Sequence, residues 1–191
     1  MKSRLLLGLF GLALCAQLAV PAAMILKRER TLAHGQAFKF RTAPVDPYDA
    51  FRGRYVALGF DRNSVVAPPG HAFARGQTVH VRLAEDADGF ATFAEVLRDP
   101  PDAAPYLTTK IQYVGGDLVH LRLPFDRFYM DENEAPAAER AYWKYSASSN
   151  RNAYVQVRIE KGFAVLEDLY VGGTPIREYL AQNPAAPKTP R

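Results

Sequence analysis

The sequence has few of the residue types that usually carry catalysis or hold metal ions. Cysteine occurs once, at Cys15 inside an apolar run, which excludes disulfides and cysteine-ligated metal from the rest of the chain. The 4 histidines are widely spaced and form no HxxxH or HExxH motif. Segment 43–50 contains no serine, so the nucleophile of a Ser-Lys membrane peptidase is missing. We therefore expect a protein that is not an enzyme and that binds no cofactor.

A basic excess is also missing from most of the chain. The whole chain carries a net charge of +4, with 24 Lys and Arg against 20 Asp and Glu. Residues 1–30 hold 5 of those basic residues and 1 of the acidic ones, which leaves 19 of each in residues 31–191. Because nucleic-acid-binding domains carry a basic surface, this balance excludes nucleic acid as the expected partner.

What the sequence does have is one long apolar run, from Leu5 to Leu26. As a helix, its 22 residues span about 33 Å, enough to cross a hydrocarbon core of about 30 Å. The charged segment KRER follows directly at 27–30. We predict that residues 1–30 form a signal anchor, which enters the lipid bilayer through residues 5–26. Cleavage after Ala22 or Ala23 is the alternative.

Orientation is less well determined, because basic residues flank both ends of the run. Lys2 and Arg4 precede it, together with the free amine, and three basic residues follow it. The segment resembles a secretory signal, so we place the N-terminus in the cytoplasm. The expected location is the inner (cytoplasmic) membrane, crossed once, with the C-terminal domain periplasmic.

Beyond the anchor, apolar and polar residues alternate with a period of two, which is typical of antiparallel strands. Asp88-Gly89 and Gly115-Gly116-Asp117 mark hairpin turns. Segment 132–145 is rich in helix formers and predicts one short helix. We expect a mostly β (α+β), antiparallel sheet or barrel-like single domain over residues 31–182, followed by a proline-rich tail at 183–191. The alternating runs are 38–42, 54–60, 77–84, 90–97, 107–114, 117–123, 153–160 and 164–171.

Two of these runs are similar to each other: GQTVHVRL at 76–83 and GDLVHLRL at 116–123. In each, a histidine and an arginine share one face and the apolar residues share the other. If the two strands are neighbours, His80 and His120 meet, and they are the only metal-site candidate that we identify. The alternative is that both histidines are solvated strand residues.

The stretch DPYDAFRGRYVALGF, residues 46–60, combines a turn with an alternating strand. Asp46 and Pro47 are suited to begin a helical turn and Gly53 to end it, so a purely structural corner is one interpretation. The other is a ligand-binding surface, to which LPFDRFYM at 123–130 adds an acid and a base that could pair with the corner. The candidate ligand-binding residues are Asp46, Tyr48, Asp49, Arg52, Arg54, Tyr55, Asp126 and Arg127; Pro47, Gly53, Leu58 and Phe60 are the structural ones.

RGRYVALGF, preceded by VDPYDAF, resembles the motif of the GDYXXLXY family of membrane-anchored bacterial proteins. The resemblance covers nearly all of the chain and maps the motif onto Gly53, Arg54, Tyr55, Leu58 and Phe60. Arg54 stands where the family has an acid, so a role that rests on that acid does not carry over. Phe60 replaces a tyrosine. The resemblance implies a single anchored extracytoplasmic domain, often associated with multi-span membrane proteins, and implies no reaction.

We therefore expect a membrane-anchored extracytoplasmic accessory or binding module that acts with a membrane protein partner. The alternative is a small envelope hydrolase or ligand-binding enzyme with its site at the 46–54 turn. That alternative requires a concave pocket with a buried, partnered carboxylate.

Overall fold

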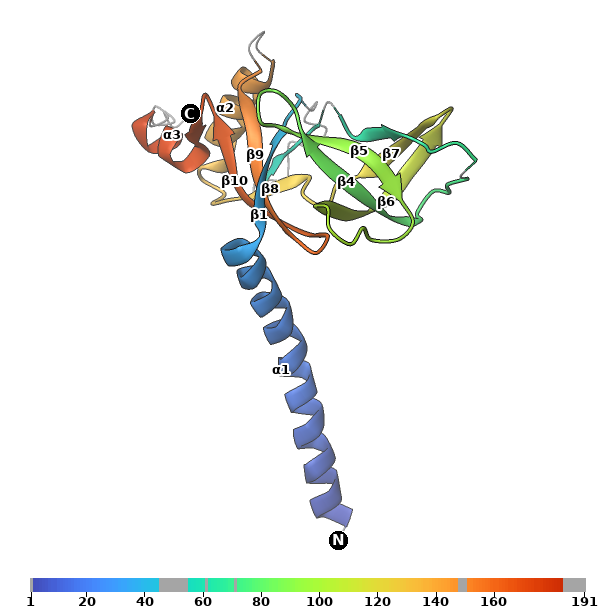
Figure 1. The fold of residues 1–191 in the computed structure, drawn as a ribbon. Coiled ribbons are helices and arrows are strands. Elements are labelled where there is room, and N and C mark those ends of the chain that lie inside the picture. The colour runs from blue at the N-terminus through green and yellow to red at the C-terminus, as the bar shows by residue number, and fades with distance from the viewer. Residues whose placement is uncertain (1, 45–54, 61, 71, 148–150, 184–191) are drawn as a thin grey trace.

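One helix protrudes from the rest of the protein (Figure 1). The computed structural model describes residues 2–44, 55–60, 62–70, 72–147 and 151–183. Within them, α1 (Lys2–His34) is long and apolar enough to cross a membrane, and the rest of the protein does not cover its apolar part. The helix does not end at the charged residues 27–30 but continues to His34. Its last turn packs on the sheet, where Thr31 is buried.

The strands form three antiparallel groups, which agree with the predicted mostly β fold. A four-stranded sheet has the order β1-β9-β10-β11, and a five-stranded sheet has the order β3-β7-β6-β4-β5. A short pair, β2-β8, lies apart from both sheets in the hydrogen-bond pattern. The strands are β1 (Gln36–Arg41), β2 (Tyr55–Ala57), β3 (Ser64–Val66), β4 (Thr78–Glu85), β5 (Ala91–Leu97), β6 (Tyr106–Gly115), β7 (Leu118–Arg122), β8 (Arg127–Tyr129), β9 (Ala153–Glu160), β10 (Phe163–Val171) and β11 (Thr174–Pro175).

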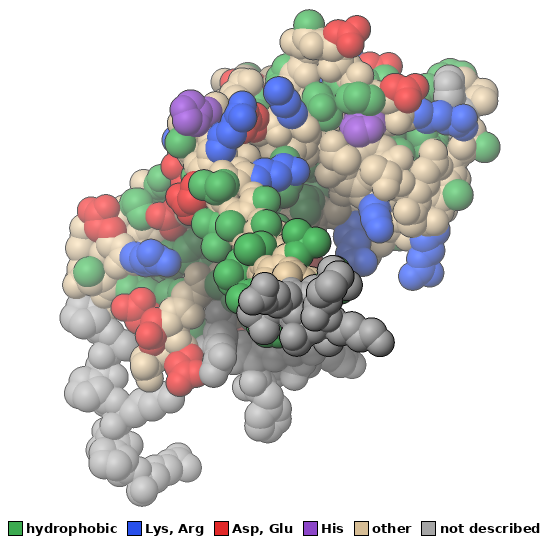
Figure 2. Space-filling model, turned by 90° about the horizontal axis from the view of Figure 1, so that it is seen from below, with side chains coloured by type: hydrophobic (Ala, Val, Ile, Leu, Met, Phe, Trp, Pro, Cys, Tyr) green, Lys and Arg blue, Asp and Glu red, His purple; other side chains and the backbone are tan. Residues whose placement is uncertain are grey.

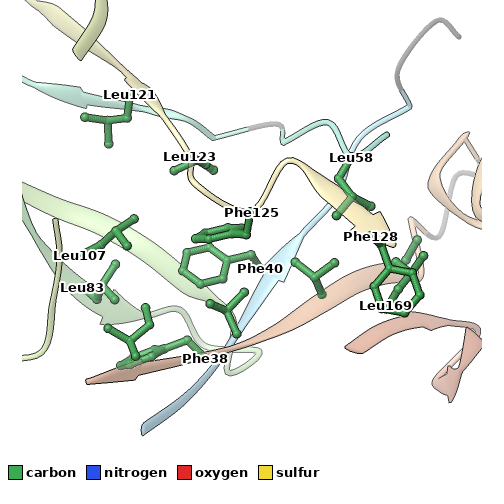
Figure 3. Packing of buried hydrophobic residues seen from close by; sticks show 14 of the residues in the cluster. Phe38, Phe40, Leu58, Leu83, Leu107, Leu121, Leu123, Phe125, Phe128 and Leu169 are labelled. Carbon is green, nitrogen blue, oxygen red and sulfur yellow. The ribbon is translucent and has the colours of Figure 1, made fainter. Parts of the chain in front are cut away.

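The core lies between the inner faces of these strands (Figure 3). Alternation along β4 and β7 places Val79, Val81, Leu83, Val119 and Leu121 inward and the histidines and arginines outward, as the two similar segments predict. Phe40 from β1 meets Phe125 from the segment before β8, with ring centroids 5.0 Å apart. Aromatic rings at such spacing add to the stability that burial alone provides. These contacts join the four-stranded sheet to the β8 segment.

Two helices besides α1 cover the sheet. The predicted helix is α2 (Ala135–Ala147), which buries Ala138 and Tyr142 as its apolar spacing predicts. A second short helix, α3 (Ile176–Gln182), follows β11 and has no counterpart in the expectations. It packs on β10 and α2, and Ile176 is fully buried. The strands β3, β8 and β11 are also additions, each of two or three residues.

The turn of the β9–β10 hairpin joins the two large sheets. The N–H of Thr108 on β6 donates to the carbonyl of Gly162, at 2.9 Å. Gly162 has a positive φ of 78°, which side chains disfavour. A Cβ at this position would lie 2.2 Å from the Thr108 Oγ1 and 2.5 Å from the ring of Tyr106. Only glycine therefore permits this close approach of hairpin and β6.

We predict that Gly162→Ala destabilises the protein by about 2–4 kcal/mol, since it adds left-handed strain to a steric overlap. Chemical unfolding of the full chain in detergent measures the loss. Gly89→Ala is the matched control, because Gly89 has a φ of 76° but nothing within 4 Å of its Cβ position. The control should lose only about 1 kcal/mol. Equal losses would show that the contact with β6 contributes nothing.

Candidate functional site

The two segments singled out in the sequence lie side by side. Strand β2 from the 54–60 run pairs with β8 from LPFDRFYM, and Tyr55 lies opposite Tyr129. The N–H of Leu58 continues the pairing by donating to the Asp126 carbonyl, at 3.0 Å. Leu58 is buried, and Phe60 packs edge-on against Phe125 with centroids 5.5 Å apart. The strand part of the motif is thus built into the core.

The turn part of the motif falls outside the described residues. This applies to Asp46, Pro47, Tyr48, Asp49, Arg52, Gly53 and Arg54, so the expected pairing of Asp126 or Arg127 with the corner has no described geometry. The two flanks of the turn are described, and they meet in a β-bridge between Ala43 and Gly59. The hydroxyl of Tyr142 on α2 donates to the Ala43 carbonyl at 2.6 Å and accepts from the Gly59 N–H at 3.2 Å. Helix α2 therefore closes the base of the turn.

Among the described candidates, Tyr55, Asp126 and Arg127 form one group. The Arg127 guanidinium lies 5.0 Å from the centroid of the Tyr55 ring, and its Nε lies 3.9 Å from the Asp126 Oδ1. A hydrogen bond with Tyr129, followed by the neighbouring Tyr55 and Asp126, raises the pKa of Arg127, so this group keeps its charge. Both members of the ion pair are about half exposed and accessible to a ligand.

Asp126 and Arg127 border a groove on the outer face of the five-stranded sheet. The groove has a volume of about 610 Å³, and a second hollow of about 490 Å³ shares Lys110, Arg122 and Asp126 with it. We call the two together the basic groove. Its lining includes four basic side chains and one acidic one: Arg75, Lys110, Arg122, Arg127 and Asp126.

Two of the basic residues face each other directly. Lys110 on β6 is the cross-strand partner of Arg122 on β7, and Thr78 on β4 lies on the other side of Lys110. Within the described residues, no ion pair with an acidic side chain is found for Lys110 or Arg122. Like charges directly opposite each other in a sheet are destabilising. Neither Lys110 nor Arg122 is among the ligand-binding residues predicted from the sequence.

The two histidines do not meet. His80 lies on β4 and His120 on β7, and β6 separates these strands. The His80 Nδ1 lies 3.0 Å from the Thr108 Oγ1, whereas the His120 ring stacks on Tyr113 with centroids 4.0 Å apart. No group of three or more His, Cys, Asp or Glu that could hold a metal ion occurs in the described part of the chain.

The acidic residues at the β4–β5 turn have a local structural role. The carboxylate of Asp86 accepts the N–H groups of Phe90 and Asp88, at 2.9 and 3.0 Å. The bond from Phe90 is the main reason that the pKa of Asp86 is lowered. Arg41 on β1 forms an ion pair with Asp88 and thereby links the turn to the other sheet. The contacts of Asp86 and Asp88 within the turn and with β1 therefore give both acidic residues a structural role.

Together, the fold and the groove define a class of protein: a β-rich module with a basic outer groove, carried on one apolar N-terminal helix. The chain belongs to the GDYXXLXY family, because the profile described as GDYXXLXY protein matches residues 17–169. The match includes the second half of α1, the motif strand and β9 to most of β10. No curated protein and no solved structure matches this chain.

We predict that Tyr142→Phe lowers the free energy of unfolding by about 1–3 kcal/mol, because the Ala43 carbonyl and the Gly59 N–H lose a buried partner. Thermal or chemical unfolding measures the change. Tyr113→Phe is the control, since Tyr113 is about half exposed and should change stability by less than about 0.5 kcal/mol. A silent Tyr142→Phe variant would show that the base of the turn does not depend on this hydroxyl.

Proposed function

We propose that the chain is a membrane-tethered binding module whose basic groove takes an anionic group, a phosphate or a carboxylate, of its ligand. The observation that carries the proposal is the direct opposition of Lys110 and Arg122 with no acidic partner among the described residues. An anion between the two would convert an unfavourable pair into a favourable one. Helix α1, which is long and apolar enough to cross a membrane, is the tether in this proposal.

The chemistry of the groove suits such a group. Arg122 and Arg127 offer planar guanidinium groups, which can hold a carboxylate or phosphate through two parallel hydrogen bonds. Lys110 adds a point charge, and Thr78 and Thr108 add hydroxyl groups on the same lining. The single carboxylate, Asp126, is an acceptor for a hydroxyl or amine on the ligand. The site therefore fits a ligand with an anionic group beside a polar, uncharged part.

We predict that Arg122→Glu has two opposite effects, both measured by thermal unfolding with and without inorganic pyrophosphate. Without the anion, the variant should be about 0.5–1 kcal/mol more stable than the wild type, because the introduced carboxylate would face Lys110. With the anion, the wild type should be stabilised and the variant should not, since only a bound ligand shifts the unfolding equilibrium.

Arg82→Glu is the matched control for this experiment. Arg82 lies on the outward face of β4, outside the groove lining, and pairs with Glu95 at 3.2 Å. Its replacement should reduce stability and leave the response to pyrophosphate intact. If Arg122→Glu and the wild type respond equally to the anion, the groove does not bind it.

The proposal places the domain outside the cytoplasm, with the N-terminus inside, as the resemblance of the apolar segment to a secretory signal suggests. We predict that protease added to intact spheroplasts removes a C-terminal tag, while a cytoplasmic marker survives. Recovery of the untreated full-length protein in the membrane fraction, instead of release of a shorter form, also distinguishes a retained anchor from cleavage after Ala22 or Ala23. Protection of the tag until the membrane is lysed would reverse the orientation.

A multi-span membrane protein is the partner that we propose for the module, as the family resemblance implies. The observation that favours a protein partner is a group of exposed apolar side chains at the β6–β7 end of the five-stranded sheet, because exposed apolar patches commonly mark interaction surfaces. The group comprises Val66, Tyr113 and Leu118, which lie on the outward face of β3, β6 and β7. The alternative of an enzyme at the 46–54 turn depends on residues outside the described part of the chain.

A further inference from the structure

The β9–β10 hairpin runs along the last turns of α1 in the direction of the apolar segment. The Arg30 Nη2 lies 3.1 Å from the Glu160 Oε1, near the end of β9. One turn nearer the N-terminus, the Lys27 Nζ lies 4.2 Å from the centroid of the Phe163 ring, at the start of β10. The hairpin turn therefore lies beside the last turns of α1, at the end of the helix where it meets the sheet (Figure 1).

This contact places the hairpin turn within reach of a lysine side chain that directly follows the apolar run. The apolar run ends at Leu26, and one residue of helix adds about 1.5 Å, so Lys27 marks the edge of the hydrocarbon region. Phe163, whose ring contacts the Lys27 ammonium group, has 36% of its surface exposed, and the neighbouring Lys161 is also exposed. Aromatic and basic residues at the boundary between hydrocarbon and headgroups are typical of membrane anchoring.

The joint between helix and sheet is close-packed. At Gly35, which follows α1 directly, a Cβ would lie 2.5 Å from the Thr31 carbonyl oxygen and 3.1 Å from the Ile159 nitrogen. The Arg158 guanidinium donates to the Gly35 carbonyl at 3.3 Å and is itself held by Glu167 at 2.7 Å. The hairpin cannot move far from the membrane without breaking these contacts.

We infer that the β9–β10 turn, residues 161–163, together with Lys27 and Arg28, binds anionic phospholipid headgroups of the bilayer that α1 crosses. The domain then lies on the membrane surface rather than on a stalk. Charge complementarity favours anionic lipid, since Lys27 and Arg28 directly follow the apolar run and Lys161 lies in the turn of the hairpin that packs on α1. Figure 2 shows Lys and Arg side chains on several sides of the helix on this face of the molecule. The inference depends on the tether and not on the anion bound in the basic groove.

Tryptophan fluorescence of the full chain in vesicles tests the inference. The chain has 1 tryptophan, Trp143, which is replaced by Phe in all variants. Phe163→Trp then supplies a hairpin probe, and Val114→Trp supplies a control probe. Leu107 forms a β-bridge with Gly162 at the hairpin turn. Val114 lies seven residues further along β6, and seven residues of strand span about 23 Å. The vesicles contain phosphatidylcholine and phosphatidylglycerol, with a fraction of lipid brominated near the headgroup.

We expect the bromolipid to quench the hairpin probe strongly and to leave the control probe almost unchanged. Adding Lys161→Glu should reduce the quenching of the hairpin probe in vesicles with phosphatidylglycerol. Lack of quenching of the hairpin probe in protein that floats with the vesicles would overturn the inference, as would equal quenching of the two probes. Protein that does not float would overturn the tether as well. Arg122→Glu in the variant with the hairpin probe should leave the quenching unchanged, so failure of the basic groove to bind an anion is a separate result.

Discussion

The packing of the Gly162 backbone against β6 is the contact on which the arrangement of the molecule depends. It is the place where the four-stranded and five-stranded sheets share a backbone hydrogen bond, from Thr108 to Gly162. The same hairpin contacts α1 through Glu160 and Phe163. One turn of two left-handed residues, Lys161 and Gly162, therefore sets how the five-stranded sheet stands relative to the helix. A side chain at 162 would separate elements that are far apart in the sequence.

A second constraint positions the family motif. The Tyr142 hydroxyl bonds to Ala43 and Gly59 on the two sides of residues 45–54, and the β2–β8 pairing fixes the strand that begins at Tyr55. The motif leucine and phenylalanine are used in the core, whereas Tyr55 faces Arg127 at the margin of the basic groove. One face of this short segment is therefore packed into the core, whereas the other face contacts the candidate site. Residues 46–54 lie outside the described part of the chain, so the choice between a structural corner and a binding surface stays a prediction.

Periodicity in the sequence predicted most of the fold, because burial on one face imposes a period of two on each long strand. It failed for β3, β8 and β11, which are too short to show a period and form only through distant partners. The opposition of Lys110 and Arg122 was hidden for a related reason. Regular pairing from Gly115 and Leu118 would place Arg122 opposite Ile111, but a bulge between Ile111 and Tyr113 shifts the register by one residue. A bulge of this kind has no reliable sequence signal. The extension of α1 to His34 was missed because the charged residues after Leu26 mark the end of the hydrocarbon span, not the end of the helix.

Strand β6 connects the β9–β10 hairpin turn with the basic groove. This strand starts beside the hairpin turn, where Leu107 bridges to Gly162, and reaches the basic groove at Lys110. Three residues of strand correspond to about 10 Å, so the groove begins within about that distance of the hairpin. If the hairpin lies on the headgroups, an anionic ligand in the groove is held close to the membrane surface. The tether then does more than keep the domain near the membrane: the close-packed joint at Gly35 would hold the groove at a fixed height. A flexible linker at that position would abolish this control of height while leaving the groove itself intact.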